Sequence, residues 1–367
     1  MMGMRAALVC VVLACTAVAR AEVPPLPGPG PRAATDDERT HRQRENVSCV
    51  GCHPQIGREW ALSLHQHAWT DDVFQKAYSV EPVAFCRSCH APESDPAVEP
   101  SARAQAIGVG CVTCHGAGGH VVGPRPAPAT ALHPVLADAR LRTPAACASC
   151  HQFDFPLDAH QIVPEPMQDT VAEHAASTAT ATPCQGCHMP SVPNEDDHGR
   201  HKSHAFTVLA DPARIKSAVK VSARRLDAGH AEISLVADRV GHAFPTGDMF
   251  RRVEVSVDSL DVRGRVLQHD TAILARSFVD VTGIDNTLQR IWAEDTRVPA
   301  PGKGARVVVL RVAPSAVTTR YRVVYQRMST PMAAAFGVSQ ILDQVEVAHG
   351  DLLPATVAVN HHQGERP

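Results

Sequence analysis

The pattern of apolar and polar positions divides the chain into two unlike parts. After residue 204, short runs rich in Val, Ile and Thr alternate with polar residues, which predicts half-buried β-strands. The runs lie at residues 218–223, 231–238, 252–259, 266–275, 306–312, 319–326 and 356–359. A hairpin turn is expected at 261–264 and one helix at 332–342. Short strands at this spacing predict an antiparallel, immunoglobulin-like β-sandwich.

The preceding part is predicted to hold short helices joined by loops rich in Pro and Gly. Ile56, Trp60 and Leu64 follow a helical spacing, which predicts a helix over residues 54–77 with a break near Thr70. A second helix is expected at 170–177 and a loop at 116–134.

These patterns predict an α+β multidomain protein. A mostly irregular, short-helix domain is expected at 45–204, followed by the β-sandwich domain at 205–367. Residues 22–44 carry five prolines and then a polar, charged run, so we expect an extended and mobile linker there.

The first residues resemble a signal peptide. A short positive segment precedes an apolar run at 6–18, and Ala19-Arg20-Ala21 offers a cleavage site. This predicts a signal peptide at 1–21 and a periplasmic or extracellular protein. The apolar run is too short to span a bilayer. Cys15 lies in a sequence similar to a lipobox, so a lipid anchor at Cys15 is an alternative to a soluble protein.

One pattern, Cys-x-x-Cys-His, occurs five times within the predicted short-helix domain. The motifs are Cys49-Val-Gly-Cys52-His53, Cys86-Arg-Ser-Cys89-His90, Cys111-Val-Thr-Cys114-His115, Cys147-Ala-Ser-Cys150-His151 and Cys184-Gln-Gly-Cys187-His188. This is the attachment pattern of c-type haem. Two thiols one helical turn apart can reach both vinyl groups on one porphyrin edge, and the following His supplies an axial iron ligand. The sequence thus predicts five covalently bound haem c groups, with zinc or dithiol sites as the alternatives.

Composition agrees with five haems in an exported protein. Ten of the twelve cysteines belong to the motifs and two lie in the signal peptide, so none remains for a disulfide. Aromatic residues make up only 4% of the chain, and porphyrins would supply the missing apolar bulk. The formal charge is −3, or −5 (−3 − 2) without the two arginines of the signal peptide. Acidity argues against nucleic acid and favours redox partners with basic patches.

Several further motifs lie around these five. They are Trp60-x-x-Ser63-x-His65, Cys114-His115-Gly116-x-Gly118-Gly119-His120, Met167-Gln168-x-Thr170, Cys187-His188-Met189-Pro190, His201-x-Ser203-His204-x-Phe206 and Gly241-His242-Ala243-Phe244-Pro245-Thr246-Gly247. With them, residues 45–330 resemble the multihaem cytochromes of the cytochrome c554 type, with a C-terminal β-domain as in larger secreted relatives.

The resemblance implies which histidines bind the second side of each iron. Distal ligands are expected at His65, His120, His204 and His242, the last donated from the β-domain.

Alternatives remain open at several of these irons. Helical spacing leaves His67 as an alternative to His65, and His201 can substitute for His204. The fifth iron could stay five-coordinate or take a second ligand from elsewhere in the chain. The candidates are His133, His160, His174, His201 and Met167.

Closely spaced haems with two histidine ligands predict electron transfer. Expected partners are other cytochromes, a quinol-oxidising complex or an outer-membrane conduit. One alternative is an oxidoreductase acting on a small nitrogen compound at an open haem, since catalysts of this kind occur among the relatives. Against it, Cys-x-x-Cys-Lys does not occur in the sequence. Another alternative is a docking subunit of an outer-membrane complex or a haem filament, joined through sheet edges.

Overall fold

The structure is a computed structural model that describes residues 36–80, 82–117, 119–155, 166–196, 199–207, 211–282, 288–337 and 344–352. The predicted signal peptide, the anchor at Cys15, His160 and the strand at 356–359 lie outside these residues. Across the described ranges, none of the helices has the length and apolar character needed to cross a bilayer.

Five helices carry the Cys-x-x-Cys-His motifs. They are α1 (Asp36–Cys52), α4 (Ala84–His90), α6 (Cys111–His115), α7 (Ala145–His151) and α9 (Cys184–His188). Each motif forms the last turn of its helix, so its two cysteines lie on one face. The connecting helices are α2 (Pro54–Ala61), η1 (Gln66–Ala68), α3 (Asp72–Val80), α5 (Ala102–Ile107), η2 (Ala139–Arg142) and α8 (Thr170–Ala175). The helix predicted at 170–177 is confirmed as α8.

The extended linker predicted up to residue 44 was wrong for its last residues, because α1 begins at Asp36. This helix lacks an apolar stripe and is held by polar anchors instead. Asn46 is buried, and its Oδ1 accepts the N–H of Val112 at 3.1 Å. Arg42 pairs with the buried Glu93 at 3.0 Å. Polar contacts between distant segments leave no periodic signal in the sequence.

The helix predicted at 54–77 is divided into α2, η1 and α3. The buried Ser63 ends α2, because its hydroxyl donates to the carbonyl of Trp60 at 2.6 Å and accepts the N–H of Gln66 at 3.2 Å. Asp71 then starts α3 by accepting the N–H of Phe74 at 2.9 Å. The break predicted near Thr70 is therefore present, and Ser63 adds an earlier one.

Short strands join the motif helices. They are β1 (Gly116–Ala117), β2 (His120–Gly123), β3 (Leu136–Ala137), β4 (Gln152–Asp154), β5 (Pro166–Asp169), β6 (Ser191–Pro193) and β7 (Arg200–Lys202). The predicted loop at 116–134 thus contains β1 and β2, which pair antiparallel.

The C-terminal part is built from two antiparallel sheets. The first has the order β14–β9–β8 and the second β11–β10–β15–β16. Their bounds are β8 (Val219–Arg225), β9 (His230–Ala237), β10 (Arg252–Leu260), β11 (Val266–Leu274), β14 (Arg306–Arg311), β15 (Thr318–Gln326) and β16 (Gln344–Leu352). The six predicted strands between 218 and 326 are confirmed, as is the turn at 261–264, where Gly264 has φ 74°.

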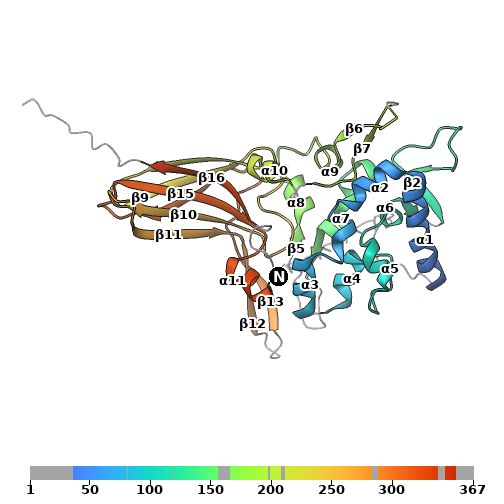
Figure 1. Ribbon diagram of the computed structural model, residues 1–367, viewed down its shortest axis with the longest axis horizontal. Coiled ribbons are helices and arrows are strands. Elements are labelled where there is room, and N and C mark those ends of the chain that lie inside the picture. The colour runs from blue at the N-terminus through green and yellow to red at the C-terminus, as the bar shows by residue number, and fades with distance from the viewer. Residues whose placement is uncertain are drawn as a thin grey trace, which may run out of the picture.

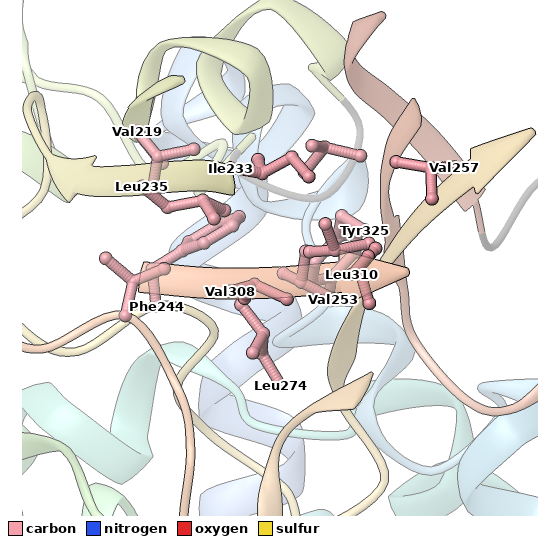
Figure 2. Packing of buried hydrophobic residues seen from close by; sticks show 14 of the residues in the cluster. Val219, Ile233, Leu235, Phe244, Val253, Val257, Leu274, Val308, Leu310 and Tyr325 are labelled. Atoms are coloured by element: carbon pink, nitrogen blue, oxygen red, sulfur yellow. The ribbon is translucent and has the colours of Figure 1, made fainter. Parts of the chain in front are cut away.

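One apolar core lies between these sheets. Alternate residues of both sheets point into it, among them Ile233 and Leu235 of β9 and Val253 of β10, all 0% exposed (Figure 2). Burial on one face and exposure on the other explains why these strands were predictable from alternation.

Five elements of the C-terminal part were not predicted or were placed differently. The hairpin β12 (Arg276–Thr282) and β13 (Leu288–Asp295) and the edge strand β16 were missed. The helix expected at 332–342 is α11 (Thr330–Phe336), and it ends at Gly337 in the left-handed region with φ 67°. A further short helix, α10 (Pro212–Ser217), leads into β8.

The two parts of the chain contact each other through ion pairs. Figure 1 shows α3, α8 and β5 on the side of the motif part that faces the sheets and α11. Arg327, directly after β15, holds Asp71 through two hydrogen bonds of 2.7 and 2.6 Å. Arg297 pairs with Glu173 of α8 at 2.7 Å. These contacts fix the C-terminal part against the motif helices.

Candidate haem-binding sites

A single large cavity runs through the motif part of the described chain. Its volume is about 2380 Å³, and four of the five motifs line it with both cysteines and the histidine. The fifth motif contributes Gln185 and Gly186. A pocket for one small ligand has roughly 300–1,000 Å³, so this cavity has room for several flat cofactors.

The motif cysteines show which motifs lie side by side. Three pairs of thiols from different motifs lie close enough to shift each other's pKa: Cys49 with Cys111, Cys89 with Cys150, and Cys147 with Cys184. Motif 1 therefore lies beside motif 3, motif 2 beside motif 4, and motif 4 beside motif 5.

Four motif histidines each face a histidine from elsewhere in the chain. The ring-centroid distances are His53–His133 6.1 Å, His115–His204 6.2 Å, His151–His65 6.3 Å and His188–His242 6.3 Å. A metal–imidazole bond is about 2 Å and the nitrogen lies about 1 Å from the ring centre, so two imidazoles on one metal have centroids about 6 Å apart. The four spacings suit one iron between each pair.

Hydrogen bonds fix the tautomer of several of these rings. The Nδ1 atoms of His115, His204 and His242 bond the carbonyls of Val122, Lys202 and Ala243 at 2.9, 2.8 and 2.9 Å. An N–H at Nδ1 leaves the lone pair of Nε2 free for a metal, the arrangement that metal-bound histidines usually show. The donor set therefore fits haem iron.

Burial keeps most of these imidazoles neutral. It lowers the pKa of His65 to about 3 and the pKa values of His151, His188, His204 and His242 to about 4. A neutral imidazole can donate its lone pair to iron at pH 7 without first losing a proton.

His90 of the second motif differs from the other four. Within the described residues, its ring contact is with Phe74, stacked at 3.6 Å and 7°, and not with a second imidazole. Its Nδ1 bonds the carbonyl of Ala68 at 2.6 Å, like the Nδ1 of His115. The charged side chains near His90 include Asp71, Asp248 and Arg327.

The alternative ligands are placed less favourably. His67 is exposed, whereas His65 lines the cavity. Both ring nitrogens of His201 are engaged, with Asn194 at 2.8 Å and Glu59 at 3.0 Å. The Nε2 of His174 bonds the carbonyl of Thr182 at 3.0 Å.

The last two candidates in the described chain also line the cavity. His120 does so from β2 with an exposed side chain, and Met167 from β5. The sequence predicts His133 only as one of several candidates for the fifth iron, whereas in the structure its ring lies opposite that of His53.

Residues that support the distal histidines could not be found from the sequence. Glu59 of α2 accepts the backbone N–H of His204 at 2.9 Å and bonds the ring of His201 at 3.0 Å. It joins residues far apart in the chain, so no local motif marks it.

The motif helices around one shared cavity define the class of protein, a multihaem c-type cytochrome. Residues 48–116 match the family described as cytochrome c554 and c-prime. The fold is similar to that of a penta-heme cytochrome c552 from Thermochromatium tepidum, with a TM-score of 0.64 and 20% identity over 83% of this chain and 97% of that chain. No curated protein matches the chain. These findings confirm the resemblance to multihaem c-type cytochromes of this family.

Proposed function

We propose that the protein is a pentahaem cytochrome that passes electrons along haems with mostly two histidine ligands. The observation that carries this proposal is the set of four imidazole pairs with centroids 6.1–6.3 Å apart. Haem c bound there supplies the one-electron chemistry of its iron. The fifteen residues of the motifs hold the five groups.

The distal ligands follow from the pairs. His65 serves motif 4, His204 serves motif 3 and His242 serves motif 5. For motif 1 the geometry favours His133 over His120, a distal ligand expected from the family resemblance that also lines the cavity. We assign His133, because its ring faces His53.

The thiol contacts support an order for the electron path. Motifs 1, 3, 4 and 5 follow one another, with motif 2 beside motif 4. The link between motifs 3 and 4 is the proximity of Cys114 to Cys147 and Cys150. Cys52 of motif 1 and Cys187 of motif 5 are exposed, whereas the cysteines of motifs 2, 3 and 4 are partly buried. Motifs 1 and 5 are therefore the proposed points of electron entry and exit.

The proposal also includes the location, partners and domains that the sequence predicts. The chain has a signal peptide, acts in the periplasm or outside the cell, and exchanges electrons with other cytochromes, a quinol-oxidising complex or an outer-membrane conduit. Its domains divide near residue 204, and the two facing sheets form an immunoglobulin-like sandwich.

A haem count joined to a potentiometric titration tests the main function. We expect five haems per chain and reversible one-electron steps from all five, because each motif has both thiols and its histidine. Fewer than five haems, or a haem that cannot be reduced reversibly, would contradict an electron carrier of this kind.

A second candidate function rests on His90. Because it faces no second imidazole in the described chain, its iron is the one suited to an open position, where a small nitrogen compound could bind and react. Turnover of nitrite or hydroxylamine with a reduced dye would favour this function. Turnover that is absent in the fully loaded protein would rule against it.

A further inference from the structure

His242 belongs to the C-terminal part, yet its ring faces the motif part. It lies in the loop between β9 and β10, and its centroid is 6.3 Å from that of His188 with the rings 16° from parallel. Its own hydrogen bond is local, from Nδ1 to the carbonyl of Ala243 at 2.9 Å. The position of His242 therefore depends on what holds the loop.

One side of the loop is anchored in the sheet core. Phe244 is buried there, and its backbone exchanges two hydrogen bonds of 2.9 Å with Val298. This anchor fixes the loop to the sheets, and leaves its placement against α9 to other contacts.

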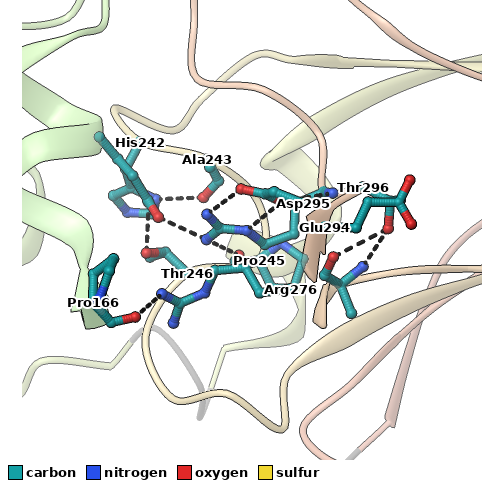
Figure 3. A network of polar contacts seen from close by, with 12 residues as sticks. Pro166, His242, Ala243, Pro245, Thr246, Arg276, Glu294, Asp295 and Thr296 are labelled. Atoms are coloured by element: carbon teal, nitrogen blue, oxygen red, sulfur yellow. Dashed lines mark hydrogen bonds and ion pairs between the residues drawn. The ribbon is translucent and has the colours of Figure 1, made fainter. Parts of the chain in front are cut away.

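The other side of the loop is held by a buried ion pair that crosses between the parts. Arg297 follows β13 and Glu173 lies on α8; their side chains are 4% and 7% exposed and 2.7 Å apart. Arg297 also donates to the carbonyl of Pro245 at 3.0 Å. The hydroxyl of Thr246 donates to Glu173 at 2.7 Å. Both ions thus bond residues just after His242, and Figure 3 shows these residues, Pro245 and Thr246, beside His242.

Further groups complete the network around these two ions. Asp295 accepts from Arg297 at 2.9 and 2.7 Å, and Thr170 of α8 bonds the hydroxyl of Thr246 at 2.8 Å. A buried ion pair is costly unless its remaining hydrogen-bonding groups are used, and here one group of each ion bonds the loop itself, at Pro245 and at Thr246. An ion pair that only held the two parts of the chain together would need no bonds to this loop.

We propose that Glu173 and Arg297 are positioning residues for His242, a clamp that fixes the loop so that its imidazole stays opposite His188. The inference rests on the proposed ligation of the fifth haem by His242. Loss of Arg297 leaves the buried Glu173 without its cation, and loss of the Glu173 charge leaves Arg297 paired with Asp295 alone. In either case the loop shifts and the distal bond lengthens or opens.

The test compares Glu173→Gln and Arg297→Lys with His242→Ala in the haem-loaded protein. Glu173→Gln keeps an acceptor for Thr246 but removes the charge. Arg297→Lys keeps the charge but loses the planar fork that reaches both Pro245 and Asp295. The matched control is Arg320→Gln. It breaks an exposed ion pair of 2.9 Å between Arg320 of β15 and Asp351 of β16.

The readout is the EPR spectrum of the oxidised protein, with and without added imidazole. His242→Ala should remove one low-spin signal. Glu173→Gln and Arg297→Lys should each reduce that same signal at least twofold in favour of a high-spin one, and imidazole should restore it. The control should keep the full signal.

Two results distinguish a failure of the clamp from a failure of the assignment of His242 as a ligand. Suppose that His242→Ala removes a low-spin signal but both clamp variants keep that signal at the level of the control. The clamp is then wrong and the assignment of His242 as a ligand stands. If His242→Ala itself changes no signal, the assignment of His242 in the proposed function fails, and the clamp fails with it. A clamp variant that does not load haem is replaced by Thr246→Val, which removes the two hydrogen bonds of the Thr246 hydroxyl and should reduce the same signal to a smaller extent.

Discussion

The imidazole rings of His65 and His151 face each other at a centroid distance of 6.3 Å, although they come from segments far apart in the chain. His65 lies between α2 and η1, where Ser63 has ended the helix and freed the chain to turn. The carbonyl of His65 accepts the N–H of Val109 at 2.8 Å, which holds this turn against the segment before motif 3.

Replacement of His65 by Ala should convert one haem from low-spin to high-spin, because the fourth motif would lose its distal imidazole. His67→Ala is the matched control two residues away, and its exposed ring should leave the spectrum unchanged. Near-infrared and EPR spectra of the oxidised variants check this. The assignment fails if His67→Ala produces the high-spin haem and His65→Ala does not.

His133→Ala should remove the second imidazole from the iron of the first haem and so change its spin state. His120→Ala should leave that spin state unchanged. The reason is the ring of His133, whose centroid lies 6.1 Å from that of His53. Magnetic circular dichroism of both variants measures the loss of a bis-imidazole iron. The reverse outcome would assign His120 to the first haem.

Asp71→Asn should destabilise the protein at neutral pH and much less in acid. Burial raises the pKa of Asp71, but the hydrogen bonds and charge of Arg327 outweigh burial and hold it below its usual value. A depressed carboxyl pKa stabilises the fold above about pH 4 and stops doing so as pH falls through the lower folded value.

Thermal unfolding of wild type and Asp71→Asn at pH 7 and pH 3 measures this difference. Loss of a paired, partly buried charge costs about 1–3 kcal/mol, so the variant should melt lower at pH 7 and the gap should shrink at pH 3. An equal gap at both pH values would show that this ion pair does not contribute as its geometry indicates.

Ile233→Ala should lower the unfolding free energy of the C-terminal part by about 2–5 kcal/mol, because it opens a cavity between the two sheets. Val309→Ala, on the exposed face of β14, is the control and should change it by under about 0.5 kcal/mol. Thermal melts followed by far-ultraviolet circular dichroism check both. Comparable losses in the two variants would contradict a core centred on Ile233.

The strands of the C-terminal part could be predicted because one face of each is buried. In β9, Ala231, Ile233 and Leu235 are 0% exposed while His230 and Val236 are exposed, which is the period of two that the sequence displays. The edge strand β16 was missed because its residues are partly buried on both faces and Gly350 interrupts them.

The motif part was predictable in its cofactor chemistry and in a few local elements such as α8, and not in how its histidines pair. Cys-x-x-Cys-His is a local pattern, so the attachment residues could be read directly. The pairing of His151 with His65 and of His188 with His242 is set by contacts between distant segments, and residues such as Glu59 and Glu173 carry no local signal. The start of α1 was missed for the same reason, since Asn46 and Arg42 anchor it to Val112 and Glu93.

We propose that four of the five motif histidines share their iron with a second imidazole and that His90, which faces none within the described residues, does not. Spin-quantified EPR of the fully oxidised protein, normalised to its haem content, tests it most directly. The account predicts low-spin signals equal to four haems per chain and a high-spin signal equal to one. High-spin signals from two or more haems, or low-spin signals from all five, would contradict it.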